Sequence, residues 1–384
     1  MVEVALLSHR FGNIGHNFMA LGAEAAAREA FGRDVRVTHY EQHHPFSIYP
    51  DGHVLRCVDK IPHGRFGFVR KYLAKPEIYQ KWWEDLPPIP YDIAIACGGP
   101  NLVAGAAGTA EMRILMHHFN GAFSHRGVPV VDAAVGSCFP LERVPNQLAV
   151  DDQAFYKKAV SYVSELTVRD PVAVKLYGKL GTFPDLIPCM AVGSGRYFEA
   201  IKEAHDQEGD DGYILVNFQA KGSNDDWDQG VDPGKWKELV RGVISDLLAD
   251  SKKVALVCHS AYELKLAAEL APELPAYFPK TEEEYGRLIA RARVGFVSRI
   301  HAAIALAGIG VPSIVVGNDT RILTTEQFGL TSIPTKALTR ERAVDEIRRL
   351  IAMRSEERDR LIALRDQTIA RYARKFVENA RGRT

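Results

Sequence analysis

The segment Ser298-Arg299-Ile300-His301, followed by Gly310-Val311-Pro312-Ser313-Ile314-Val315-Val316, decides the expected fold of this chain. The run 294–297 predicts a buried strand, residues 301–307 a helix of small residues, and 311–316 the next parallel strand. We expect Ser298 to cap the helix, because its hydroxyl can accept a bond from an unpaired backbone N–H.

Arg299 and His301 open this predicted helix, just beyond the end of a strand. Ligands of open α/β sheets bind outside the carboxyl ends of the strands, and a helix N-terminus favours anions. The pattern therefore predicts that both residues face a phosphate or carboxylate. The alternative is a surface arginine beside a structurally satisfied histidine.

Short apolar runs alternate with helical patterns along the whole chain, which is typical of parallel sheets covered by helices. Expected strands fall near 3–7, 35–39, 92–96, 128–133, 165–168, 213–218, 254–258, 294–297 and 311–316. Expected helices fall near 17–31, 109–121, 153–162, after Pro171, and near 233–249, 261–270, 281–291 and 299–307. We predict an α/β protein with two Rossmann-like domains facing a central cleft, the glycosyltransferase-B-like arrangement.

The domain boundaries follow from a change in composition. Residues 192–212 become polar, acidic and glycine-rich, so we place the junction there. The predicted domains are 1–200 and 201–338; the family resemblance given below implies an acceptor site in the first and a donor site in the second. Residues 339–384 form a charged helical tail, predicted as two solvated helices of which one packs on the body.

The bulk composition excludes several classes of protein. The 48 Lys and Arg residues balance 48 Asp and Glu residues, so no net field favours nucleic acid. The five cysteines are scattered and show no zinc-ligand spacing, so we expect no metal and a reducing, cytoplasmic location. Met1–Leu7 predicts a strand rather than a signal peptide, and no apolar run is long enough to cross a bilayer.

Several further polar residues lie at the ends of predicted strands. Arg169 follows an apolar strand and precedes Asp170-Pro171, an expected helix cap. A buried arginine without a partner is costly, so Arg169 either pairs with Asp170 or points at an anion. Asn217, Lys221 and Arg321 follow other strands and are further donor-binding candidates. His259 either lines the same cleft or is a satisfied buried histidine.

The acceptor-side candidates follow the first and third predicted strands. The turn Phe11-Gly12-Asn13-Ile14-Gly15-His16 allows close approach of a ligand, or serves only as a turn. Two adjacent glycines follow the third strand, in Cys97-Gly98-Gly99-Pro100-Asn101. This pattern predicts that the backbone passes close to a ligand or to a neighbouring helix. We select as acceptor-binding candidates Asn13, Gly15, His16, Gly98, Gly99 and Asn101.

The segment from Tyr40 to Trp83 is rich in histidine and aromatic residues, including Trp82-Trp83. Aromatic faces interleaved with polar groups suit sugar rings. A large loop that packs its own aromatic side chains is the competing interpretation.

The ordered motifs resemble those of the polysaccharide pyruvyl transferase family. The segment 298–305 with Gly310-Val311-Pro312 resembles its C-terminal signature, and Thr167-Val168-Arg169-Asp170 its central motif. The glycine turn at 11–15 and the pair Gly98-Gly99 are similar to its N-terminal motifs. The chain departs from the family pattern at His16, Pro100 and Asn318-Asp319-Thr320-Arg321.

The resemblance implies transfer of a pyruvyl group from phosphoenolpyruvate to two hydroxyls of a sugar, forming a cyclic ketal in polysaccharide biosynthesis. Phosphoenolpyruvate is then a donor substrate, no cofactor is required, and the acceptor is a carbohydrate that can be lipid-linked, with peripheral membrane contact. Arg169, Arg299, the helix start at Ser298, Lys221, Asn217 and Arg321 would bind the donor, with His301 as general acid and base.

Two other functions fit the same residues. A glycosyltransferase would use a nucleotide-sugar donor on the same fold, with the arginines holding a diphosphate. A non-enzymatic relative would bind a glycan or a protein, but it has no physical need for Arg299 and His301 at a cleft.

Overall fold

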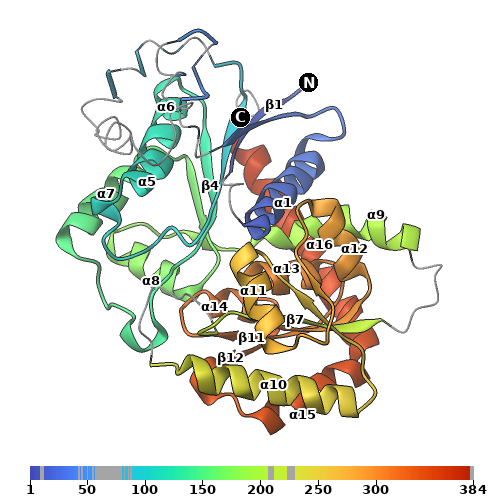
Figure 1. Ribbon diagram of the computed structural model, residues 1–384. Coiled ribbons are helices and arrows are strands. Elements are labelled where there is room, and N and C mark those ends of the chain that lie inside the picture. The colour runs from blue at the N-terminus through green and yellow to red at the C-terminus, as the bar shows by residue number, and fades with distance from the viewer. Residues whose placement is uncertain are drawn as a thin grey trace.

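The protein is described by a computed structural model whose described residues form two parallel six-stranded sheets, one in each of two adjoining domains (Figure 1). It describes residues 1–8, 13–41, 44, 46–49, 51–53, 56, 80–81, 83–84, 86, 89–205, 212–222 and 230–380. Most of the aromatic segment 40–83, including His43, His63 and Trp82, therefore lies outside the described residues, as do Phe11 and Gly12 of the glycine turn.

The amino-terminal sheet has the order β2-β1-β3-β4-β5-β6. Its strands are β1 (Glu3–Ser8), β2 (Arg36–Glu41), β3 (Ile93–Cys97), β4 (Val130–Val135), β5 (Glu165–Val168) and β6 (Asp185–Leu186). The helical segments of this half are α1 (Ile14–Phe31), η1 (Ala106–Gly108), α5 (Ala110–Arg113), η2 (Ile114–Phe119), α6 (Asn120–His125), η3 (Leu141–Arg143), α7 (Val150–Val160) and α8 (Pro171–Lys179).

The carboxyl-terminal sheet has the order β12-β11-β10-β7-β8-β9. Its strands are β7 (Tyr213–Asn217), β8 (Val254–Val257), β9 (Ala276–Tyr277), β10 (Ala292–Val297), β11 (Ser313–Gly317) and β12 (Thr331–Pro334). Its helices are α10 (Pro233–Ala249), α11 (Ala261–Leu270), α12 (Glu282–Ala290), α13 (Ile300–Gly308), α14 (Ile322–Glu326) and the short η6 (Thr335–Ala337).

These strand orders confirm the two Rossmann-like domains. In such sheets ligands bind where the strand order reverses, beyond the carboxyl ends of the strands. In the second sheet this point lies between β7 and β10, which end at Asn217 and Val297. In the first sheet it lies between β1 and β3, which end at Ser8 and Cys97.

Side-chain hydrogen bonds cap several helices at their first turn. Asp170 caps α8 by accepting a bond from the Ala173 backbone N–H at 2.9 Å, with Pro171 at the first helical position. Thr281 caps α12 by accepting from the Glu284 N–H at 3.1 Å. Ser298, by contrast, does not cap α13: its own N–H still bonds the Asn217 carbonyl, so Arg299 occupies the cap position.

The predicted junction 192–212 contains structure that sequence patterns missed. Residues Met190–Ser194 (η4) and Gly195–His205 (α9) are helical, and η4 packs closely on α1. Gly22 of α1 allows this packing, since a Cβ there would collide with the Met190 carbonyl. The short edge strands β6, β9 and β12 were also missed; the first two have only two residues each.

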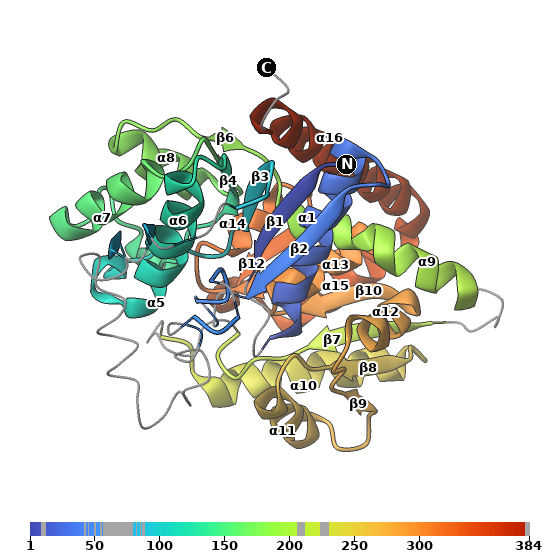
Figure 2. The same ribbon diagram turned by 90° about the horizontal axis from the view of Figure 1, so that it is seen from above.

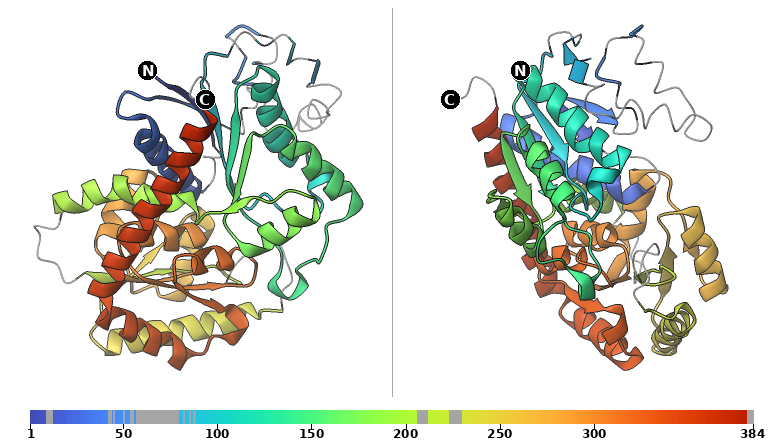
Figure 3. Two further views of the ribbon diagram at one scale, coloured as in Figure 1. Left: turned by 180° about the vertical axis from the view of Figure 1, so that it is seen from behind. Right: turned by 90° about the vertical axis from the view of Figure 1, so that its left-hand side faces the viewer.

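Both helices of the tail pack on the body, which corrects the prediction of a largely solvated tail. Helix α15 (Arg340–Ala352) lies beside α10 below the second sheet, and its buried residues join that domain's core. Helix α16 (Arg354–Asn379) runs from the second domain to α1 of the first (Figures 2 and 3). One hydrophobic cluster accordingly contains side chains of α1, α13, α16 and both sheets.

We predict that truncating the buried face of α16 destabilises the whole molecule. Phe376 is completely buried in the shared cluster, so Phe376→Ala should lower the free energy of unfolding by about 3–5 kcal/mol. Exposed Arg374 on the same helix gives the control, Arg374→Ala, with a change within about 0.5 kcal/mol. Equilibrium unfolding in urea measures both, and equal small effects would contradict the packing of the tail.

Candidate functional site

Arg169 and His301 meet across the boundary between the two domains. Arg169 directly follows β5 of the first sheet, and His301 is the second residue of α13, which follows β10 of the second. Arg169 Nη1 lies 3.4 Å from His301 Nε2. The structure thus brings together two of the three predicted catalytic residues, at the carboxyl ends of strands from both sheets.

The Arg169 guanidinium is buried and has no anionic partner among the described residues. Its side chain is only 1% exposed. Besides His301, Nη1 contacts Cys189 Sγ at 3.3 Å and Met19 Sδ at 3.9 Å, both weak acceptors. Its Nε has no hydrogen-bond partner in the part of the chain that the structure describes. Of the two sequence-based alternatives for Arg169, pairing with Asp170 is therefore wrong, because Asp170 accepts from Ser137 and from the Ala173 N–H instead. A buried charge without a counter-ion is costly to the fold.

The space that Arg169 occupies depends on Gly136, which sequence analysis did not single out. A Cβ at Gly136 would collide with Arg169 Nε. Two residues earlier, Ala134 has a φ of 61°, an uncommon left-handed conformation, where the pairing of β4 with β5 shifts register. After this irregularity of β4 the backbone lies against the Arg169 side chain at Gly136. A bulge of this kind could not be predicted from the sequence, where an isolated glycine is its single local signal.

His301 is held neutral at physiological pH by its surroundings. Burial lowers its pKa well below the usual value of 6.5, and electrostatic interactions, chiefly with the nearby Arg169 guanidinium, lower it further. Since arginine can only donate, Nε2 accepts from Arg169 and the ring proton is assigned to Nδ1. A bound anion would raise this pKa, because it would offset the surrounding positive charge.

Arg299 lies on the other side of the α13 start and is tied to a buried carboxylate. Its Nε and Nη2 donate to Glu263 Oε1 at 2.7 and 2.5 Å. Glu263 also accepts from Asn217 Nδ2 and from the His259 backbone N–H, at 3.0 and 2.8 Å. In the amide orientation that satisfies its neighbours, Gln219 accepts a further bond from Arg299. The predicted donor residues Asn217 and Arg299 therefore lie together at the strand-order reversal of the second sheet, with Glu263 neutralising the arginine.

The segment after β11 ties the two domains together. Thr320 Oγ1 accepts from Ser137 Oγ at 2.7 Å, and Ser137 donates through its backbone N–H to Asp170, also at 2.7 Å. The Thr320 N–H donates to the Phe139 carbonyl at 2.8 Å. Arg321, the next residue, pairs with Asp319 at 2.7 Å, and its charge acts on His301. This segment thus holds Arg321 near the Arg169–His301 contact.

The first turn of α1 closes the site from the amino-terminal domain. Asn13 caps α1, and its Oδ1 contacts the Gly15 N–H at 2.9 Å and His259 Nδ1 at 3.2 Å. Gly15 packs on His301, where a Cβ would meet the imidazole. The His16 ring lies edge-on to that of His301, with 6.0 Å between centroids. Asn13, Gly15 and His16, predicted as acceptor residues, therefore contact the same site as the donor residues.

His259 is a satisfied buried histidine that links the domains. It is 2% exposed, and its Nε2 lies 3.1 Å from the Tyr285 hydroxyl. Burial lowers its pKa to about 4, so the ring is neutral. Neither Tyr285 nor Glu263 was singled out from the sequence, because both lie within ordinary helical patterns.

The remaining candidates are explained in part by local packing. A Cβ at Gly98 would collide with the backbone carbonyls of β4, so a strand rather than a helix requires this glycine. Asn101 is buried, and its carbonyl accepts from the Tyr156 hydroxyl at 2.7 Å. The Lys221 carbonyl accepts from Asn318 Nδ2 at 2.7 Å. No hydrogen bond between the described residues joins Gly98, Gly99 or Asn101 to His301.

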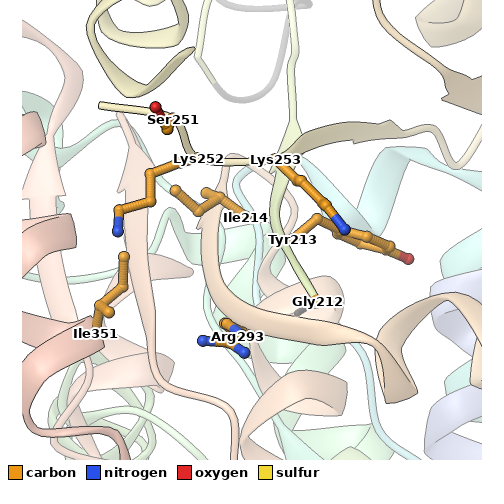
Figure 4. Close-up of a pocket in the computed structure, with 8 residues that line it drawn as sticks. All are labelled: Gly212, Tyr213, Ile214, Ser251, Lys252, Lys253, Arg293 and Ile351. Carbon is orange, nitrogen blue, oxygen red and sulfur yellow. The ribbon is translucent and has the colours of Figure 1, made fainter. Parts of the chain in front are cut away.

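A pocket of about 220 Å³ lies at the opposite edge of the second sheet, where its strands begin (Figure 4). Its basic residues are Lys252, Lys253 and Arg293. Ligands of parallel sheets bind beyond the carboxyl ends of the strands, so we do not assign the chemistry to this pocket. Among the described residues no cluster of His, Cys, Asp and Glu could hold a metal ion, and no helix could span a bilayer.

The fold is similar to that of UDP-GlcNAc 2-epimerases. The Neisseria meningitidis enzyme, solved bound to UDP-GlcNAc, matches with a TM-score of 0.55 and 7% identity over 99% of both chains. A putative UDP-N-acetylglucosamine 2-epimerase from Listeria monocytogenes matches at 0.56 and 11% identity, over 99% of this chain and 98% of that one. The Methanocaldococcus jannaschii enzyme, in complex with UDP-GlcNAc and UDP, matches at 0.51 and 14%, over 91% and 93%. No protein-family model and no curated protein matches the chain.

We predict that Glu263 is essential for stability. Glu263→Ala leaves Arg299 without its carboxylate, so the free energy of unfolding should fall by about 3–5 kcal/mol. Glu269 on the same helix is an exposed partner of Lys237, and Glu269→Ala should cost less than about 1 kcal/mol. Urea unfolding compares the two; equal costs would show that the buried ion pair contributes little.

The lowered pKa of His259 predicts a pH dependence of stability. Its folded-state pKa is about 4 and its usual value 6.5. Between these values the unfolded chain binds the proton more tightly, so acidification removes up to about 1.4 kcal/mol per pH unit. His259→Gln should reduce this slope between pH 6.5 and 4, whereas His125→Gln, at an exposed site, serves as the control. An unchanged slope in His259→Gln would contradict the buried, neutral histidine.

Proposed function

We propose that the protein transfers a pyruvyl group from phosphoenolpyruvate to two hydroxyls of a carbohydrate. The observation that carries the proposal is the buried Arg169 guanidinium, which faces His301 across the domain boundary without a described counter-ion. Phosphoenolpyruvate is a compact donor with a phosphate and a carboxylate, and such groups bind arginine strongly. The ordered motifs that resemble the pyruvyl transferase family support the same donor.

The residues fit the chemistry in distinct roles. Arg169 would neutralise the donor's negative charge, with Arg321, already paired with Asp319, adding less, while the neighbouring His301 would gain a proton as the anion binds. One acceptor hydroxyl adds across the donor double bond: its oxygen bonds to C2, and a proton reaches C3 through His301. The second hydroxyl then displaces phosphate from C2, and its proton leaves with the phosphate. The product is a cyclic ketal carrying a methyl and a carboxylate.

Arg299 has a different part in this proposal. Because Glu263 already neutralises it, it contributes less net charge to donor binding than Arg169. It also occupies the cap position of α13 and donates its backbone N–H to Asn217 Oδ1 at 3.0 Å. It therefore fixes the start of the helix that carries His301, and its guanidinium forms the edge of the site.

A nucleotide-sugar donor is the second candidate. The strand order of the second sheet reverses beside Asn217 and Arg299, where parallel sheets commonly bind ligands, and the epimerases of similar fold are described with UDP-GlcNAc. The fold comparisons favour this candidate over pyruvyl transfer. Such an enzyme would hold the diphosphate between this strand-order reversal and Arg169.

Calorimetry with phosphoenolpyruvate and with UDP-GlcNAc separates the two candidates. We expect phosphoenolpyruvate to bind, and Arg169→Met to weaken its binding by about 2–5 kcal/mol because a buried charge pairing is lost. Lys157→Met, at an exposed site on α7, is the control and should bind as the wild type does. Binding of the nucleotide sugar alone would favour the second candidate and reject pyruvyl transfer.

His301→Gln tests the proposed proton transfer. It keeps a polar side chain near Arg169 but removes the titrating ring, so phosphate release in the presence of a sugar acceptor should fall about 10²–10⁴-fold. Phosphoenolpyruvate should still bind within about tenfold of wild-type affinity, since Arg169 remains. Unchanged turnover in this variant would exclude His301 from the chemistry.

A further inference from the structure

A second pocket, of about 280 Å³, lies between the two domains on the carboxyl-end side of the second sheet. The first domain contributes the loop that begins at Pro140, and the second contributes the ends of β11 and β12. The pocket is lined by Pro140, Leu141, Glu142, Arg143, Asn318, Pro334 and Lys336. Neither the sequence motifs nor the donor site accounts for it.

Two hydrogen-bonded chain segments line the pocket, one that begins at Pro140 and one that includes Asn318. Pro140 and Asp319 form an antiparallel bridge, and the Leu141 N–H donates to the Asn318 carbonyl at 3.0 Å. Asn318 is three residues before Arg321, a separation of at most about 11 Å between Cα atoms. Arg321 in turn acts electrostatically on His301. The chain segment that lines the pocket therefore continues into the segment whose charge acts on His301.

The lining combines apolar surface with polar groups at its edges. Pro140, Leu141 and Pro334 offer apolar faces, which suit the C–H face of a sugar ring. Asn318 is buried and oriented by its bond to the Lys221 carbonyl, and no hydrogen bond between described residues uses its Oδ1. Glu142 and Lys336 form an ion pair at 2.9 Å across the domain boundary, with both side chains largely exposed. Such a pair is weak and can open to bind hydroxyls.

We propose that this pocket binds a sugar residue of the acceptor, adjacent to the sugar that reacts. The proposal rests on the proposed function only in taking a carbohydrate as the acceptor class. The apolar floor holds the ring face, and the Asn318 amide with the Glu142–Lys336 pair recognises its hydroxyls. Acceptor recognition then lies mainly in the interdomain pocket rather than at Gly98, Gly99 and Asn101.

Filling the pocket tests this assignment. Leu141 is half-buried in the short segment η3, and Leu141→Trp should place an indole in the space for the ring. Leu248, 37% exposed on α10 and remote from the pocket, gives the matched control Leu248→Trp. Saturation-transfer NMR with free glucose, galactose, mannose and N-acetylglucosamine reports sugar binding without any donor. Calorimetry with phosphoenolpyruvate reports donor binding separately.

We expect at least one of these sugars to bind the wild type and Leu248→Trp, and its affinity to fall about tenfold or more in Leu141→Trp. Donor affinity should change less than twofold in both variants. Sugar binding that survives in Leu141→Trp would overturn the pocket assignment, as would the absence of sugar binding to the wild type. If phosphoenolpyruvate does not bind the wild type, the proposed donor is rejected. The sugar-binding result alone then tests the pocket assignment.

Discussion

The arrangement of the site depends on one buried cation. Arg169 is almost fully enclosed, yet its hydrogen-bond neighbours among the described residues are two sulfur atoms and a neutral imidazole rather than a carboxylate. Because a buried charge without a partner costs free energy, the folded protein retains it at the expense of stability. Groups that lower stability in this way are typical of binding and catalytic sites. An anion that enters the site would supply the missing interaction.

The rest of the structure keeps this cation at the boundary of two domains. Helix α16 crosses from the second domain to pack on α1, and a single hydrophobic cluster spans both sheets. The Ser137–Thr320 and His259–Asn13 contacts add polar ties beside the site. Since these contacts join the two domains, they help to fix the distance between the strand ends that carry Arg169 and His301. The site is therefore organised before a ligand binds, which reduces the entropic cost of binding.

The parallel sheets and most long helices could be predicted from the sequence because apolar runs and caps are local signals. Asp170-Pro171 and Thr281 specify helix starts through their own side chains. The candidates Arg169 and His301 could be found because both follow apolar strands. The contacts of Arg299 could not be predicted, since its partner Glu263 belongs to an ordinary helix 36 residues away. The irregularity at Ala134 and the packing of α16 depend on tertiary contacts that no local pattern encodes.

The most direct test of this account is the stability of Arg169→Met without any ligand, measured by equilibrium unfolding in urea. Methionine is apolar and fits beside Met19 and Cys189, so removing the unpartnered charge should raise the free energy of unfolding by about 0.5–2 kcal/mol. A structural arginine would behave in the opposite way. A loss of about 3 kcal/mol or more would show that Arg169 is held by interactions within the fold, and would contradict its role as an anion-binding group.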